Sequence, residues 1–355
     1  MTLEDLGYNS SLESYRTEHD LANFGVGRVI AEHKERYIVK TAIQDYEGEI
    51  LGNLRYTAQS RADFPAVGDW VAISDYDTDK VLIHAVFPRS SILQRQAVGK
   101  KGDAQIIATN IDTAFIVQAA DRGFSINRIE RYLTICNDSK VNPMIILNKI
   151  DLVSEDILSE LLESIAKRLP KVPVIAISNT TQQGLDVVKT LIEKGKTYCL
   201  LGSSGVGKST LLNTLSGQEL MKTNTISEHT SRGRHVTTHR ELQVLNNGGI
   251  IIDNPGMREV GITEVTEGLE LTFETILELA KQCKFKDCTH TTEKGCAVIA
   301  AVDSGEIDAM SYENYLKMER EKEHFEATVA EKRKKDKAFG KMVKEFKNAK
   351  KRGKY

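Results

Sequence analysis

The segment from residue 202 to residue 209 reads Gly-Ser-Ser-Gly-Val-Gly-Lys-Ser and matches the phosphate-binding pattern G-x-x-x-x-G-K-[ST]. It follows the apolar stretch 197–201 and opens an expected helix, 208–215, which is the context that the pattern requires. In such a loop backbone N–H groups surround the phosphates, the lysine reaches the β- and γ-phosphates, and the serine hydroxyl binds Mg²⁺. A chance match in a chain of this length is on the order of one in a hundred. We therefore expect nucleotide contacts from Gly202, Ser203, Ser204, Gly205, Val206, Gly207, Lys208, Ser209 and Thr210.

A second apolar stretch, 250–252, ends in the Asp-x-x-Gly sequence that runs from Asp253 to Gly256. An aspartate at a strand end can hold Mg²⁺ through water, and the glycine N–H can sense the γ-phosphate. The pattern is weak alone, but it is strong when it follows a phosphate loop at a strand end. We expect Asp253 to join Ser209 at the magnesium ion.

The base-recognition signal is Asn148-Lys149-Ile150-Asp151, which follows the apolar stretch 144–147. A carboxylate can accept both the ring N–H and the exocyclic amine of guanine, and adenine offers no such pair. An isolated N-K-x-D is more often a solvated loop, but here a later apolar stretch ends at a position suited to back the base. We expect GTP or GDP to contact Asn148, Lys149, Asp151, Ser178 and Asn179.

The order of these motifs is unusual. The base-recognition motif precedes the phosphate loop, whereas ordinary regulatory GTPases have the opposite order. The sequence therefore predicts a circularly permuted GTPase.

Met257 follows Gly256, near the position where other GTPases have a glutamine that orients the attacking water. A hydrophobic side chain cannot orient water, so a residue elsewhere in the chain must do so. The segment 232–240 lies between the phosphate loop and Asp253, where the first switch belongs. It offers His235 and His239 as candidates to position water, against the simpler interpretation of surface loop residues. Its threonines, 237 and 238, are candidate Mg²⁺ ligands.

A compact group of soft ligands follows in the last third of the chain. Cys283, Cys288, His290 and Cys296 supply three thiolates and one imidazole, the tetrahedral set that structural zinc prefers. Four protein ligands would close the site, so we expect one structural Zn²⁺ rather than a catalytic one.

Two kinds of elements must position these residues. Short β-like stretches near the start, separated by Gly, Asp and Pro turns, predict a small barrel of OB type, although an SH3-like barrel fits the same pattern. The following apolar stretches alternate with helical segments, which predicts a parallel sheet covered by helices on both faces, with ligands at the carboxyl ends of the strands. The expected barrel strands are 25–30, 37–39, 49–54 and 69–73, and the later strands are 113–117, 144–147, 172–177 and 197–201.

These patterns divide the chain into parts. We expect a multidomain protein with an OB-type barrel, a central α/β P-loop GTPase that is circularly permuted, and a C-terminal α-helical zinc-binding domain. The expected boundaries are 1–21 for a flexible lead-in, 22–105 for the barrel, 106–265 for the GTPase, and 266–355 for the zinc domain with its tail.

The composition is that of a cytoplasmic protein rather than a membrane or secreted one. The 355 residues contain no long apolar run and begin without a secretory signal, and three of the five cysteines group with a histidine, which favours a reducing compartment. The net charge of −2 hides a tail: residues 331–355 hold twelve Lys/Arg and three Asp/Glu, a net of +9, which leaves −11 elsewhere. A basic tail suits contact with RNA, and a solvated amphipathic helix is the alternative.

With these residues in hand, the chain resembles the RsgA (YjeQ-type) family of ribosome small subunit-dependent GTPases over roughly residues 22–300. The resemblance rests on the permuted motif order, the 234–238 segment, the zinc-ligand spacing, and the segments 108–112 and 128–133. It implies an N-terminal OB fold, a GTPase domain and a zinc domain. It also implies GTP hydrolysis stimulated by the small ribosomal subunit during late maturation, and contact with its rRNA.

The resemblance assigns further roles. It gives His235 the water-activating role beside the catalytic Lys208, and we expect a monomer that binds neither DNA nor membrane. Val236 replaces the first threonine of the family's His-Thr-Thr-Thr motif, so the Mg²⁺-sensing residue is Thr237 or Thr238, and we favour Thr238. The alternatives are a GTPase with another RNA or protein target, a non-catalytic nucleotide-dependent RNA-binding protein, and an ATPase.

Overall fold

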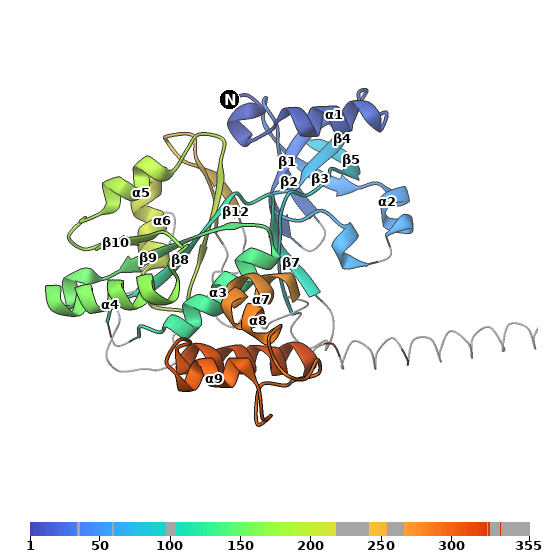
Figure 1. Ribbon diagram of the computed structural model, residues 1–355. Coiled ribbons are helices and arrows are strands. Elements are labelled where there is room, and N and C mark those ends of the chain that lie inside the picture. Colours follow the sequence, from blue (N-terminus) through green and yellow to red (C-terminus); the bar gives the residue numbers. More distant parts are fainter. Residues whose placement is uncertain are drawn as a thin grey trace, which may run out of the picture.

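The computed structural model describes residues 1–33, 36–58, 60–96, 104–121, 123–217, 241–253, 266–324, 326 and 334. Figure 1 shows a small barrel beside a larger sheet that is covered by helices, with a group of helices below them. None of the helices in these ranges is both long and apolar enough to cross a membrane.

The barrel consists of five strands that close in the order β1-β2-β3-β5-β4-β1. The helix α2 and a short 3-10 turn connect β3 to β4, and β3 pairs with β5 in parallel, which confirms the OB type over an SH3-like barrel. The chain turns into α2 at Gly52, so the strand expected over 49–54 is wrong beyond Ile50. The bounds are β1 Gly25–His33, β2 Arg36–Lys40, β3 Asp45–Ile50, α2 Gly52–Thr57, η2 Arg61–Asp63, β4 Trp70–Asp77 and β5 Lys80–Val86.

The interior of the barrel is narrow, and glycines make room for it. A Cβ added to Gly27 would lie 2.4 Å from one methyl carbon of Val39, and a Cβ added to Gly48 would lie 2.8 Å from the other. Glycine inside a strand commonly marks such a close approach. Val39 is fully buried among the apolar side chains that fill the barrel.

The first residues pack on the outside of the barrel. Residues 1–21 are expected to be a flexible lead-in, but the structure instead forms η1 (Glu4–Leu6) and α1 (Ser10–Glu18) there. Leu6 is fully buried, and the ring of Tyr8 meets the edge of Trp70 at a centroid distance of 5.0 Å. Apolar burial therefore orders a segment whose sequence is mostly polar.

The central sheet has the strand order β10-β9-β8-β11-β13-β12, parallel throughout except for β12. One hydrophobic core lies between the sheet and α3 and α4, and a second lies between the opposite face and α5 and α6. The predicted doubly covered α/β domain is thus confirmed. The bounds are β8 Thr113–Ala119, α3 Ile126–Asp138, β9 Asn142–Asn148, η3 Ile150–Leu152, α4 Glu155–Arg168, β10 Val174–Ala176, α5 Leu185–Leu191, β11 Thr197–Leu201, α6 Lys208–Ser216, β12 Glu241–Val244 and β13 Ile250–Asp253.

Barrel and central sheet are joined in one eleven-stranded sheet within the described residues, because β1 pairs with β12 at Ala31 and Glu241. A separate hairpin of β6 (Ile92–Gln96) and β7 (Ala104–Thr109) lies where the chain passes between them. The Arg28 side chain is buried at this junction and donates hydrogen bonds to the carbonyl oxygens of Gly68, Leu6 and Asn110 and to the hydroxyl of Thr197.

The C-terminal module, defined here as residues 266–324, packs against α3. It contains α7 (Thr266–Thr272), α8 (Glu274–Ala280), α9 (Ala297–Asp303) and a further helix over residues 309–324. Its own apolar core includes Phe273, Val298 and Met318. The basic tail after residue 330 lies outside the described residues apart from Lys334, so its helical prediction stays a prediction.

Candidate functional site

The phosphate loop follows β11, whose five residues are all buried. Gly202, Gly205 and Gly207 have φ angles of 147°, 82° and 96°, a region that side chains rarely adopt. A Cβ on Gly202 would also lie 2.3 Å from the carbonyl oxygen of Val117 on the neighbouring strand. These positions require glycine, and they turn the chain so that α6 begins at Lys208.

The Lys208 side chain folds back over this loop. Its Nζ lies 2.7 Å from the carbonyl oxygens of both Gly202 and Ser203. The arrangement places an ammonium group against the loop at the N-terminus of α6, where the helix dipole also favours an anion. Ser209 and Thr210 follow in the first turn of the helix.

The predicted base-recognition residues meet the phosphate loop directly. Asn148 is buried at the end of β9, and its Nδ2 donates to the carbonyl oxygen of Val206 over 2.7 Å. Its Oδ1 accepts hydrogen bonds from the backbone N–H groups of Lys149 (2.8 Å) and Asn179 (3.3 Å). A Cβ on Gly207 would lie 2.3 Å from Nδ2 of Asn148, so the two loops are in close contact.

The next loop holds the carboxylate of Asp151, which is predicted to recognise guanine. The Ser178 hydroxyl donates to Oδ1 of Asp151 over 2.5 Å and accepts from the backbone N–H groups of Thr180 and Thr181. Asn179 adds a side-chain contact, since its Nδ2 donates to the carbonyl oxygen of Gly207 over 3.1 Å. The sequence predicts Asn179 at the nucleotide and does not indicate this contact with Gly207.

Two further residues at the site were not assigned from the sequence. Asp121 follows β8, and its Oδ2 lies 3.2 Å from Nζ of Lys149. Burial raises the pKa of Asp121, but hydrogen bonds from the Gly123 N–H and the Lys149 ammonium outweigh it and leave the pKa below its ordinary value. Arg128 lies in the first turn of α3, with Nη1 3.3 Å from the Ser203 hydroxyl. Their positions in the sequence could have indicated them, because Asp121 and Arg128 both follow the carboxyl end of a parallel strand, where ligands bind.

The remaining predicted residues are placed only in part. Strands β11 and β13 are parallel neighbours, so the backbone of Asp253 reaches the same edge of the sheet as Gly202. Gly256, His235, Thr238 and Met257 lie outside the described residues, and their predicted roles stay predictions.

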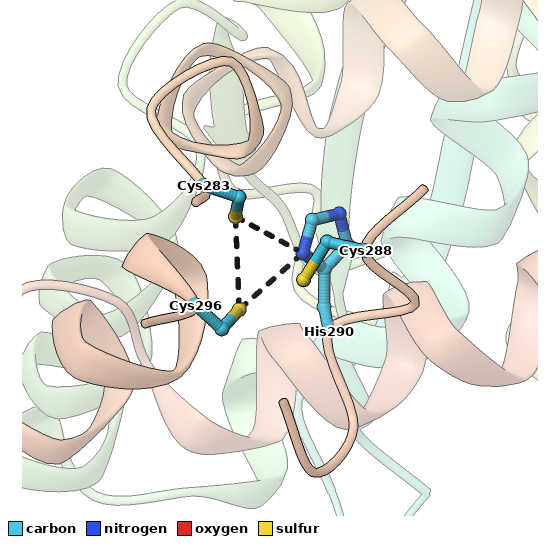
Figure 2. Close-up of side chains that lie close together, drawn as sticks. All are labelled: Cys283, Cys288, His290 and Cys296. Atoms are coloured by element: carbon cyan, nitrogen blue, oxygen red, sulfur yellow. Dashed lines mark hydrogen bonds between the residues drawn. The ribbon is translucent and has the colours of Figure 1, made fainter. Parts of the chain in front are cut away.

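The four predicted zinc ligands come together in the C-terminal module, and Figure 2 shows their side chains directed toward one another. The Sγ atoms of Cys283 and Cys296 are 3.8 Å apart, and the His290 Nδ1 lies 3.6 Å and 3.4 Å from them. All four ligand atoms lie within 4.8 Å of one another. A tetrahedral zinc ion with bonds of about 2.3 Å to sulfur and 2.0 Å to nitrogen separates its ligands by about 3.5–3.8 Å, so the residues fit this ion.

The loop that carries His290 is fixed by one carboxylate. Glu293 accepts hydrogen bonds from the hydroxyl and N–H of Thr289 and from the N–H groups of Thr291 and Thr292. These bonds, the Thr289 hydroxyl foremost, lower the pKa of Glu293 to about 2. The Tyr312 hydroxyl donates to the carbonyl oxygen of His290.

Comparison with known proteins places this arrangement in a class. The sequence model of the RsgA GTPase family matches residues 86–263. A model of the ABC transporter family matches residues 185–346, a range that includes β11, the phosphate loop and α6, elements that different P-loop nucleoside triphosphatases share.

Individual relatives agree with the first match. The chain is 45% identical over 296 residues to the small ribosomal subunit biogenesis GTPase RsgA 2 of Lactiplantibacillus plantarum, covering 83% of each chain. It is 38% identical over 346 residues to RsgA 1 of Bacteroides thetaiotaomicron, covering 97% of this chain and 96% of the relative. The structure resembles YjeQ from Thermotoga maritima with a TM-score of 0.62 and 26% identity, over 83% of this chain and 96% of that chain. The fold also resembles YloQ, a circularly permuted GTPase, with a TM-score of 0.61 over 88% and 98% of the two chains.

The chain belongs to the RsgA GTPase family. The family match confirms the predicted GTPase class and implies guanine nucleotide and Mg²⁺ as its ligands.

Proposed function

We propose that this protein hydrolyses GTP and acts in the late maturation of the small ribosomal subunit in the cytoplasm, with hydrolysis stimulated by that subunit. The observation that supports this most is the assembly of the two nucleotide loops. Hydrogen bonds of Asn148 and Asn179 to the carbonyl oxygens of Val206 and Gly207 bring a guanine-reading carboxylate and a phosphate loop into one site. The relatives named as small ribosomal subunit biogenesis GTPases support the target.

The roles within this site follow from chemistry. Asp151 would accept the ring N–H and amine of guanine, Lys149 would cover the base, and Lys208 would neutralise charge on the β- and γ-phosphates. The Mg²⁺ ligands in this proposal are Ser209, Asp253 and Thr238. The ion held by these residues would neutralise negative charge on the phosphates during transfer. His235 takes the role of positioning water.

The C-terminal module would hold one structural zinc ion through Cys283, Cys288, His290 and Cys296. Zinc would fix the knuckle by joining the end of α8 to the start of α9, since its four protein ligands leave no open position. We propose that the module and the basic tail contact rRNA and that the protein acts as a monomer.

The barrel limits where RNA can bind. The outward side of β3, the end of β4 and the β4–β5 turn expose six carboxylates, and Lys40 on this side is paired with Asp45 at 2.6 Å. A phosphate backbone is repelled by such a surface. We therefore propose that rRNA contacts the protein away from Asp45, Glu47, Glu49, Asp75, Asp77 and Asp79.

The decisive experiment is GTP turnover with and without purified small ribosomal subunits. We expect subunits to raise the turnover of the wild type at least tenfold, because activators of phosphoryl transfer typically raise rates by more than this. Lys208→Ala should stay inactive with subunits present. No stimulation would remove the subunit as activator and favour another target. No turnover under any condition would favour a non-catalytic nucleotide-dependent binder.

A variant with altered base specificity shows whether the measured turnover comes from this nucleotide site. Asp151→Asn places an amide where the carboxylate was, so it should lose guanine and gain xanthine, whose second carbonyl replaces the amine. Stimulated hydrolysis of xanthosine triphosphate by this variant would exclude a contaminating GTPase. Preference of the wild type for ATP in a competition assay would overturn the guanine assignment.

A further inference from the structure

Helix α3 touches the nucleotide site at one end. In its first turn the Nη1 of Arg128 donates to the Ser203 hydroxyl over 3.3 Å and to the carbonyl oxygen of Gly123 over 3.2 Å. Ser203 is the second residue of the phosphate loop, and its carbonyl oxygen also accepts from Lys208. Arg128 therefore contacts the side chain of Ser203, and the backbone carbonyl of the same residue binds the ammonium group of Lys208.

The rest of the helix is clamped to the C-terminal module. Buried Glu130 accepts hydrogen bonds from Ser311 (3.0 Å) and Asn314 (2.6 Å), and it is paired with Arg168 of α4 at 2.6 Å. At the next residue of α3, Nη2 of Arg131 lies 2.6 Å and 2.7 Å from the two carboxylate oxygens of Glu321. Close to its end, Asn137 donates to the Thr272 hydroxyl over 3.0 Å.

Helix α3 and the C-terminal module also approach each other closely through their backbones. A Cβ added to Gly268 in α7 would lie 2.1 Å from the carbonyl oxygen of Thr134 and 2.7 Å from the backbone nitrogen of Asp138. Close packing of this kind leaves no space for the module to slide without moving α3. A helix of this length spans about 20 Å and behaves as a rigid element over that distance.

We propose that α3 couples the C-terminal module to the phosphate loop, and that Arg128 is the positioning residue through which the coupling reaches Ser203. When a binding partner displaces the C-terminal module, α3 moves with the module and the affinity for nucleotide changes. This route is additional to the chain connection between Asp253 and the module. The inference requires guanine-nucleotide binding but not the ribosomal target, so it is tested without ribosomes.

The first test measures the affinities for GDP and for a non-hydrolysable GTP analogue by calorimetry. Arg128→Ala should weaken both by about tenfold, as expected for loss of a hydrogen bond from a charged group. Ser203→Ala should have a similar effect, and the double variant should be no worse than either single variant. Arg128→Lys, which keeps the charge, should recover part of the loss.

Two results would overturn the positioning role. An unchanged GDP affinity in Arg128→Ala would show that the loop does not depend on this contact. A loss confined to the GTP analogue would mean that Arg128 acts on the γ-phosphate itself. Thermal unfolding of each variant, measured without nucleotide, separates a change of the site from a loss of folding.

The second test addresses the coupling. Glu321→Gln weakens the clamp on α3 at a partly exposed position, and we expect GDP affinity to fall about two- to tenfold in the wild-type background but not in Arg128→Ala. The matched control is Glu274→Gln, which breaks the exposed 2.6 Å pair with Lys171 between the same module and the chain beyond α4. This control should leave affinity unchanged. Additive effects of Glu321→Gln and Arg128→Ala, or an equal effect of Glu274→Gln, would overturn the coupling.

Discussion

The side-chain amide of Asn148 lies 2.7 Å from the carbonyl oxygen of Val206, so the predicted base-recognition loop and the predicted phosphate loop are held together by a buried hydrogen bond. The two residues are separated by 58 positions in the chain. A bond that fixes two loops of one site relative to each other lowers the ordering that binding requires.

Asn148→Ala should therefore weaken GDP binding by about a hundredfold or more. The change removes one buried donor and an acceptor for two backbone N–H groups, at about 1–3 kcal/mol for each group left unsatisfied. Calorimetric titration with GDP measures the effect. The control is Asn142→Ala at the exposed start of the same strand, and equal losses in both variants would contradict the assignment.

Arg28→Met should destabilise the junction between barrel and GTPase by about 3 kcal/mol or more. The guanidinium is buried, and its loss leaves several buried acceptors without their donor. Burial lowers the pKa of Arg28 to about 10, while Asp112 and Asp69 act in the opposite direction, so the group stays charged at neutral pH. Urea unfolding measures the change.

The same urea experiment needs a variant on the barrel surface. Arg36→Met replaces an exposed arginine of β2 and should unfold at the wild-type midpoint. A midpoint for Arg28→Met that equals that of Arg36→Met would show that the buried contacts contribute nothing.

Cys288→Ser should abolish stable zinc binding. We expect one zinc ion per wild-type chain by mass spectrometry after dialysis, and well below one for the variant, because a hydroxyl is a much poorer ligand than a thiolate. Loss of zinc should also increase hydrogen exchange in α9, whose N-cap is the predicted ligand Cys296. Cys136→Ala, which removes a buried thiol outside the cluster, should retain the metal.

Glu293→Gln should lower the stability of the Cys/His loop, residues 283–296, at neutral pH. The folded-state pKa of Glu293 is lowered from 4.5 to about 2, so its contribution is fully present above pH 4.5 and is lost as the pH falls toward 2. The difference in unfolding temperature between wild type and variant should shrink over this window. A difference that stays constant from pH 6 to pH 2.5 would show that the charge of Glu293 does not matter.

Local patterns predicted the parts of this protein that local physics determines. The phosphate loop could be read because only glycine tolerates the backbone of Gly202, Gly205 and Gly207. The four predicted zinc ligands lie within fourteen residues, so their spacing already restricts them to one compact loop. The alternation of apolar stretches and helical segments is also a local pattern, and it predicted the parallel sheet.

Contacts between distant segments could not be predicted. Arg131 and Glu321 are 190 residues apart, and nothing near either residue in the sequence indicates the other. The helix α1 had one local signal, Asn9, whose side chain caps it by accepting from the N–H of Leu12. Its ordering depends on Leu6 and Tyr8 packing against the barrel, which only the tertiary structure reveals.

The pairing of β1 with β12 has a practical consequence for dissecting this protein. Within the described residues, β12 has β13 on one side and β1 of the barrel on the other. Removing the barrel would turn β12 into an open edge, and unpaired edges recruit strands from other chains. A shortened GTPase domain should therefore self-associate, and its oligomers would come from the truncation rather than from the native protein.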